Sequence, residues 1–315
     1  MSDPAISAEA GLAAEARHAG AAAFERSFWR RFRRHRLAVA SGLALIVLAA
    51  LVMAEPLVAA ALVLDGDAVD LLNLAAPPSA AHPLGTDELG RDLLLRLLEG
   101  GRVSLGIGLA AALAAAAVGT VLGLAAGYFG GHVDGVLMRL TDGVIALPRL
   151  PLLIVLAAID PAKLGVPDGL AHSPMLGLWR IAAIVSLVGW TTVARLARGA
   201  ALSLREREFV RAAEALGAGP LRIMAMHILP NVAAPLVVAT TLSVGGIILL
   251  ESVLSFLGLG IQPPMASWGN MLTGAQAAIW TAPALAIWPG LLIFATVICC
   301  NFLGDGLQDA LDPRA

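Results

Sequence analysis

Long apolar runs without a single charged side chain are the feature that most constrains this sequence, and the clearest are residues 37–54 and 103–131. A helix needs about 20 apolar residues to cross the hydrocarbon core of a bilayer, so both runs are long enough to span one. Overall, 58% of the residues are hydrophobic and 14% are charged, and the mean hydropathy is +0.83. This composition excludes an ordinary soluble domain and indicates an all-α polytopic membrane protein.

Four further stretches are long enough to span, although their boundaries are less clean. The stretch 135–159 is the least regular, because it carries Asp142, Arg149 and two prolines. The charge-free region 252–304 is too long for one helix, and the Pro-Pro pair at 263–264 predicts an outside loop that dips toward the bilayer. The sequence therefore predicts six transmembrane helices, at about residues 37–54, 103–131, 135–159, 176–196, 232–250 and 283–303.

The placement of arginine predicts the orientation, because basic loops are retained on the cytoplasmic side. Seven arginines precede the first span, and six spans would put 15 basic residues inside and five outside. Both termini are therefore expected in the cytoplasm. The predicted organisation is a cytoplasmic tail with a basic interfacial segment (1–36), the first span with an external loop (37–102), a core of five spans (103–304) and a cytoplasmic tail (305–315).

Side chains that carry enzyme or metal chemistry are scarce. The one lysine, Lys163, lies in DPAKLG, so the chain has no GxxxxGK[ST] phosphate loop and is not expected to bind ATP by itself. Cys299 and Cys300 are adjacent in an apolar run and are expected to pack in the core, while the six histidines are scattered. We expect no catalytic residue, no metal or cofactor bound by this chain, and no nucleic-acid partner.

The predicted external loop contains a second recognisable element. HPLGTDELGRDLLLRLLEGG predicts a turn followed by a short amphipathic helix, with Thr86 or Asp87 as its cap. Two interpretations fit this element: a packing element at the interface, or a surface that receives substrate or a delivery protein.

The stretch 199–230, between the fourth and fifth spans, is predicted to form two short cytoplasmic helices. Ser203 and Glu206 make a capping box for the first, and Gly217 ends it in a left-handed conformation. Pro220 starts the second helix, which ends at Pro230. The first helix would pack through an apolar face made of Phe209, Ala212, Ala213 and Leu216. On this pattern alone, a docking element and a connecting loop fit equally well.

Three charged residues in or beside the spans are candidates for a translocation path or gate: Asp142, Arg149 and Glu251. A charge that faces lipid costs several kcal/mol, so Arg149 is expected to line the path, to pair with Asp142 or Glu251, or to lie at an interface beside a broken helix. Asp142 lies about two turns before Arg149, hence on the same face. Because it is nearer the cytoplasmic end, a gate or a cap fits it as well as contact with the ligand does. Glu251 is either an interface carboxylate or a cavity carboxylate.

Two other sets of residues suggest packing and anchoring. Glycines in the second span permit close approach of another helix, in this chain or in a partner. They include Gly119, Gly123 and Gly127. Indole rings prefer the membrane interface. The expected anchors are Trp179, Trp268, Trp280 and Trp288.

The stretch 199–230 resembles the EAA loop of ABC importer permeases, whose pattern is Glu-Ala-Ala, three residues, Gly, nine residues, then Ile-x-Leu-Pro. The places of the pattern are taken by Arg211, Ala212, Ala213, Gly217, His227, Leu229 and Pro230. Arg211 replaces the acid and His227 the isoleucine, while Glu214 lies one turn beyond Arg211. The resemblance implies that this loop couples the permease to a separate ATPase.

Nearly the whole chain is similar to the C-type permeases of dipeptide, oligopeptide and nickel importers. The similar stretches are RRHRLAVASGLALIV, HPLGTDELGRDLLLRLLEGGRVSLGIG, GYFGGHVDGVLMRLTDGVIALP and LESVLSFLGLGIQPPMASWGNML, whereas DPAKLGVPDGLAHSPM and ALPRLP depart from the pattern. The resemblance implies a permease core at 103–304 in the bacterial inner membrane. It also implies a second permease, two cytoplasmic ABC ATPases that bind ATP and Mg, an external solute-binding protein and surrounding lipid.

The main interpretation is therefore a permease subunit of an ATP-driven importer, for peptides or peptide-like solutes. An ion-driven secondary transporter using Asp142, Arg149 and Glu251 is the second interpretation, and a membrane-embedded hydrolase the third. The sequence shows no repeat between its halves and no GxSxG motif, which disfavours both. Dipeptides, longer peptides, nickel chelates, opines and peptide-like antibiotics stay open as substrates.

Overall fold

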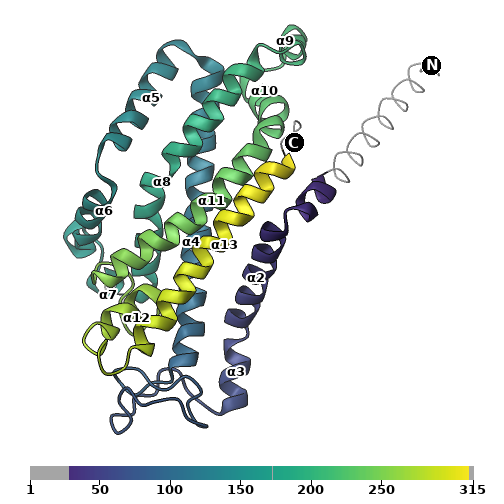
Figure 1. The fold of residues 1–315 in the computed structure, drawn as a ribbon. Helices are drawn as coiled ribbons and strands as arrows, with labels where there is room; N and C mark the ends of the chain where they lie inside the picture. The colour runs from purple at the N-terminus through teal and green to yellow at the C-terminus, as the bar shows by residue number, and fades with distance from the viewer. Residues whose placement is uncertain (1–27, 172, 312–315) are drawn as a thin grey trace, which may run out of the picture.

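A computed structural model of the protein describes residues 28–171 and 173–311 as a bundle of helices, with no β-strand among them (Figure 1). Five helices are long and apolar enough to cross a membrane. They are α2 (Arg36–Met53), α4 (Leu93–Phe129), α8 (Pro174–Arg205), α11 (Leu229–Phe256) with the turns before it, and α13 (Ala284–Leu311). The all-α prediction is confirmed, while most of the tail predicted at 1–36 and the end of that at 305–315 lie outside the described residues.

Shorter elements connect these helices. They are α3 (Glu55–Leu62), α5 (Gly131–Ala146), α6 (Arg149–Ala158), the 3-10 turn η1 (Pro161–Leu164), α7 (Asp168–Ala171), α9 (Glu208–Ala215), α10 (Pro220–Ile223), the π-helical turn η2 (Met224–Ile228) and α12 (Trp268–Ala275). The start of α2, the end of α13, α9 and α10 lie at one end of the bundle, and α7 and α12 lie at the other (Figure 1). His35 and Asp309 approach to 3.8 Å, which joins the start of α2 to the end of α13.

The third predicted span, over 135–159, is not one continuous helix. The chain forms α5 and α6 there, with an 88° bend between them. Leu147 and Pro148 lie at the bend in extended backbone conformation. Proline has no N–H for a helical hydrogen bond, and its ring disfavours helical geometry for the residue before it. The bent pair counts as a sixth candidate span if both helices belong to one crossing.

The most extensive helix contact joins α4 to α8. It runs along the predicted glycine positions of α4. A Cβ added at Gly119 would lie 2.5 Å from the carbonyl oxygen of Trp190, and one at Gly123 would meet the carbonyl oxygen of Ala194. The backbones therefore approach more closely than any larger residue allows. The predicted role of these glycines in helix packing is confirmed, and the contact lies within this chain.

The start of α4 differs from the prediction. The short helix predicted within residues 82–101 is not separate from the second span, because α4 is unbroken from Leu93 to Phe129. Its cap is Asp92, whose carboxylate accepts a hydrogen bond of 2.9 Å from the N–H of Leu95. The predicted cap Asp87 instead stabilises the preceding turn, where it accepts a 2.9 Å bond from the backbone N–H of Arg91.

After α11 the chain folds back, at the turn that the Pro-Pro pair predicts. Within the turn, Ser255 accepts a 3.0 Å bond from the N–H of Ile261. The chain then enters α12, where Trp268 is fully buried and donates from Nε1 to the carbonyl of Leu97 on α4 at 2.9 Å. The prediction that Trp268 anchors a membrane interface is therefore wrong, because its N–H already has a partner in the protein.

A buried arginine joins the segments at this end. Arg96 of α4 is 3% exposed. It donates hydrogen bonds of 3.0 Å to Asp67, Glu99 and the carbonyl of Pro264. The chain before α4 and the turn before α12 are thus held on the same helix.

Candidate functional site

The first candidate site is the pair of short helices between α8 and α11. Its inner side is apolar: Val210 and Ala213 of α9 pack with Ile223 and Ile228 from the turns that follow. The predicted capping box is wrong, because Ser203 lies in the last turn of α8 and α9 begins only at Glu208. Since α9 starts later than predicted, it packs through a different face.

The outer side of this helix pair carries apolar side chains that are open to the surroundings. Of the four residues predicted to form the packed face of the first helix, only Ala213 is buried, while Phe209 is 43% and Leu216 88% exposed. On the next turns Leu221 is 79% and Met226 69% exposed. Large apolar side chains exposed together are typical of a contact surface. We call Phe209, Leu216, Leu221 and Met226 the α9–α10 surface.

Gly217 makes the turn between α9 and α10, as predicted. Its φ is +84°, a conformation that side-chain-bearing residues adopt at a cost, and no atom lies within 4 Å of where its Cβ would be. The N–H groups of Gly217 and Ala218 bond to Glu214 and Ala213 at 2.9 and 3.0 Å, which closes the end of α9. Pro220 then takes the first turn of α10, also as predicted.

The second helix does not end at Pro230, so this prediction is wrong. The chain passes from α10 through η2 into α11 without a break, and Pro220–Phe256 forms one continuous helical span candidate. Pro230 falls in the first turn of α11, where η2 precedes it. The side chain of Asn231 donates 2.7 Å to the carbonyl of His227. Leu221 and Met226 of the α9–α10 surface therefore lie on the same continuous helical segment as a long membrane helix.

The remaining residues of the predicted loop have defined places. Arg211 donates 2.7 Å to Glu206, and Glu214 accepts 3.0 Å from the hydroxyl of Tyr128 at the end of α4. Hydrogen bonds from Arg211 and Arg205 hold the pKa of the Glu206 carboxyl below its usual value. Ala212 and Pro230 are exposed, whereas His227 and Leu229 are half-buried.

The three path candidates do not come together. Asp142 pairs with Arg195 of α8 at 2.5 Å, and both side chains are more than half exposed. Arg149 is the first residue of α6 and is exposed, with no ion pair among the described residues. The expected pairing of Arg149 with Asp142 or Glu251 is therefore wrong, because the bend places Arg149 at a helix start. The broken-helix interpretation is the one that the structure supports.

Glu251 lies in a closed polar cluster inside the bundle. Its side chain is 0% exposed, so it is neither at an interface nor open to a cavity. Its carboxylate accepts 3.2 Å from Ser104 of α4 and 2.6 Å from Ser255 one turn later. Ser104 also accepts 3.2 Å from the N–H of Trp268. The sequence contains one signal of this cluster, the i, i+4 spacing of Glu251 and Ser255, but gives no indication of Ser104.

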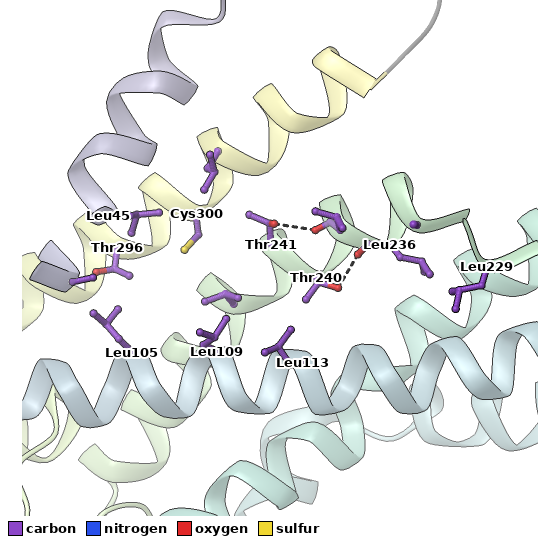
Figure 2. A pocket seen from close by; sticks show the side chains of 15 residues that line it. Leu45, Leu105, Leu109, Leu113, Leu229, Leu236, Thr240, Thr241, Thr296 and Cys300 are labelled. Carbon is purple, nitrogen blue, oxygen red and sulfur yellow. Dashed lines mark hydrogen bonds between the residues drawn. The ribbon is translucent and has the colours of Figure 1, made fainter. Parts of the chain in front are cut away.

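An apolar cavity lies between α2, α4, α11 and α13, and Figure 2 shows its lining. Its volume is about 600 Å³. The hydroxyls of Thr240, Thr241 and Thr296 donate 2.7 to 2.9 Å back to carbonyls of their own helices. The rest of the lining is apolar apart from the thiol of Cys300, which is buried as predicted. This cavity suits apolar chains and offers little to a polar solute.

Metal chemistry has no candidate in the part of the chain that the structure describes. No three His, Cys, Asp or Glu side chains gather there in a group that could hold an ion.

Comparison with known proteins gives consistent matches. Residues 119–315 match the family of binding-protein-dependent transport system inner membrane components, and residues 24–78 match the N-terminal transmembrane domain of oligopeptide transport permease C. The oligopeptide transport system permease protein OppC of Escherichia coli K12 is 41% identical over 92% of each chain. The glutathione transport system permease protein GsiD of Pectobacterium atrosepticum is 40% identical, over 92% of this chain and 91% of the relative. OppC of Bacillus subtilis is 35% identical, over 91% and 90%.

The fold also matches a solved transporter. A chain of the methionine ABC transporter MetNI, in an inward-facing conformation, superposes with a TM-score of 0.53 at 16% identity, over 70% of this chain and 98% of that one. This likeness concerns the fold. Together with the family matches, it confirms the resemblance that the sequence carries. The chain belongs to the family of binding-protein-dependent transport system inner membrane components.

Proposed function

We propose that this chain is one of two permease subunits of an ATP-driven importer for peptides or peptide-like solutes in the bacterial inner membrane. Six spans cross the membrane, counting α5 with α6, and both termini are cytoplasmic. A second permease completes the translocation path, and an external solute-binding protein delivers the substrate. Two cytoplasmic ABC ATPases bind ATP and Mg, and this chain catalyses no reaction. Nucleic acid has no part in the assembly.

The observation that carries the proposal is the α9–α10 surface and its rigid connection to α11. Four large apolar side chains are exposed along α9, the turn after it, α10 and η2, and an exposed apolar patch favours a protein partner. Because α10, η2 and α11 are continuous, a displacement of this surface moves a membrane helix directly. Coupling to an ATPase needs both properties. Arg211, Ala212, Ala213, Glu214, Gly217, His227, Leu229 and Pro230 form or support the coupling loop.

The substrate class is taken from the named relatives. The oligopeptide and glutathione permeases of Escherichia coli and Pectobacterium atrosepticum are both named for peptides or a peptide-like solute, and both align over more than nine-tenths of this chain. We therefore assign peptides first among the open substrates.

Two of the path candidates, Asp142 and Arg149, suit a gate rather than a binding site. Asp142 and Arg195 form an exposed pair between α5 and α8, beside the bend that leads to Arg149. An exposed ion pair is worth little in stability, so it can open and close at little cost. Glu251 is closed off from any cavity, and we assign it to the packing that frames the path.

The test is gentle purification of the tagged chain from native membranes, followed by mass spectrometry and reconstitution. We expect an ATPase and a second permease in amounts comparable to this chain, and ATP-dependent peptide uptake in the presence of the binding protein. Leu216→Glu places a charge in the α9–α10 surface and is expected to lose the ATPase while the second permease remains. Lys163→Gln, at the other end of the bundle, is the control. Recovery of the chain alone with ion-driven uptake would establish the secondary transporter instead.

A further inference from the structure

A second cavity, of about 460 Å³, lies at the end of the bundle opposite the α9–α10 surface. Its walls come from the end of α6, the turn into η1, the start of α8 and the turn after α11. The volume is within the range of about 300–1,000 Å³ that is usual for small-molecule sites. In contrast to the cavity of Figure 2, its lining is substantially polar.

Two opposite charges line this cavity without neutralising one another. Asp160 follows α6, and Arg180 lies two turns into α8. They are the two charged residues in the lining of this cavity, and neither forms an ion pair in the part of the chain that the structure describes. Two charges of opposite sign facing one space attract any molecule that carries both.

Each of the two groups has bonding capacity left. Arg180 donates from Nη1 to the carbonyl of Ile159 at 3.3 Å, and no hydrogen bond among the described residues engages its Nη2. One carboxylate oxygen of Asp160 accepts 3.0 Å from the N–H of Ala162, and no hydrogen bond from another described residue engages the other oxygen. A guanidinium binds a carboxylate through two parallel hydrogen bonds.

We propose that this cavity is a subsite for a zwitterionic peptide, with Arg180 binding the terminal carboxylate and Asp160 the terminal ammonium. The proposal rests on the proposed function and names the part of the substrate that this chain recognises. The cavity lies at the end of the bundle assigned to the outside, where an imported solute enters. Both termini of a short peptide are bound in one cavity, and the side chains are left without specific contacts.

The test uses the reconstituted transporter with its ATPases, partner permease and binding protein. The probes are a tripeptide mixture with free termini, the same mixture amidated at the carboxyl terminus, and the same mixture acetylated at the amino terminus. Imported peptides are measured by mass spectrometry. Because all variants share one binding protein, its own preference cancels when each variant is compared with the unmodified transporter.

Arg180→Gln is expected to raise KM for free tripeptides about tenfold and to lower the preference over amidated ones by about the same factor relative to the unmodified transporter, since loss of one charge-assisted contact is worth at least such a factor. Asp160→Asn is expected to do the same for the preference over acetylated peptides. Lys163→Gln, which removes a nearby exposed charge outside the cavity, leaves both preferences unchanged. ATP hydrolysis without peptide reports intact assembly.

Each outcome is decisive. If the unmodified transporter imports peptides and the variants keep both preferences, the subsite is refuted while the proposed function stands. If the unmodified transporter imports no peptide, the proposed function fails and the subsite with it. If Arg180→Gln does not assemble, Arg180→Lys, which keeps the charge, and Asp160→Asn are measured instead. The subsite is then refuted if Asp160→Asn keeps the preference over acetylated peptides.

Discussion

Ser104 of α4 donates a hydrogen bond of 3.2 Å to the carboxylate of Glu251 on α11, across 147 positions of sequence. The same hydroxyl oxygen accepts a bond from the N–H of Trp268 at the start of α12. One buried carboxylate therefore holds together two membrane helices and the turn between α11 and α13. A movement of α12 away from α4 has to break the hydrogen bond between Trp268 and Ser104. The packing at this end of the bundle therefore depends on the polar cluster around Glu251.

The Glu251 cluster predicts a difference between two substitutions of this residue. Glu251→Leu leaves the hydroxyls of Ser104 and Ser255 buried without their acceptor, and we expect it to lower the free energy of unfolding by about 2–3 kcal/mol. Glu251→Gln keeps one acceptor oxygen and should cost less than half as much. Thermal unfolding of the purified transporter in detergent measures both. Equal shifts for the two variants would show that the hydrogen bonds do not stabilise the fold.

The contact of α4 with α8 predicts a second difference, between two glycines of one helix. A Cβ at Gly123 meets the carbonyl of Ala194, whereas at Gly106 no atom lies within 4 Å of it. Gly123→Ala is expected to destabilise the protein by about 1–3 kcal/mol through overpacking. Gly106→Ala is expected to be neutral or to stabilise slightly, because alanine favours helix. The amount of each variant in the membrane and its thermal midpoint test this, and similar values for both would contradict the packing argument.

The parts of the fold that follow from hydropathy could be predicted. The long apolar runs predicted the five long helices. Gly217 and Pro220 predicted the turn between α9 and α10, and the Pro-Pro pair predicted the turn after α11. Each of these depends on the chain itself, through the transfer of apolar residues to lipid or through backbone geometry at glycine and proline. The ALPRLP sequence indicated a disturbance, but its 88° bend depends on what α5 and α6 pack against.

The candidate site was less predictable, because it depends on tertiary contacts. We expected the apolar face of the helix after Ser203 to be buried, as in a helix that packs on its own protein. The structure exposes Phe209 and Leu216 of that face and buries Val210 instead. Asp160 and Arg180 were not singled out either, since they meet in one cavity only after α6 bends back beside α8.

The contacts of the Glu206 carboxyl predict a small dependence of stability on pH. Arg211 and Arg205 hold its pKa below the usual value in the folded protein. A depressed folded-state pKa gives stability that is present above the unfolded-state pKa and is lost as the pH falls through the folded-state pKa. Arg211→Gln is expected to move the titration midpoint of Glu206 upward and to leave the thermal midpoint at neutral pH nearly unchanged, because the group is exposed. Titration of ¹³C-labelled glutamate followed by NMR measures the midpoint, with Glu206→Gln to assign the signal. An unchanged midpoint would contradict the contact.

Gly217 allows the coupling proposal to be tested through backbone geometry. Its φ of +84° suits glycine and is tolerated by asparagine, but it costs a residue such as leucine about 1–2 kcal/mol. Gly217→Leu is therefore expected to shift the turn between α9 and α10 and to reduce peptide-stimulated ATP hydrolysis and uptake about tenfold, the factor that corresponds to 1.4 kcal/mol. Gly217→Asn is the matched control and should retain both activities. The two variants should insert into the membrane in equal amounts, because a Cβ at this position meets no other atom. Full activity of Gly217→Leu would show that the geometry of this turn does not govern coupling.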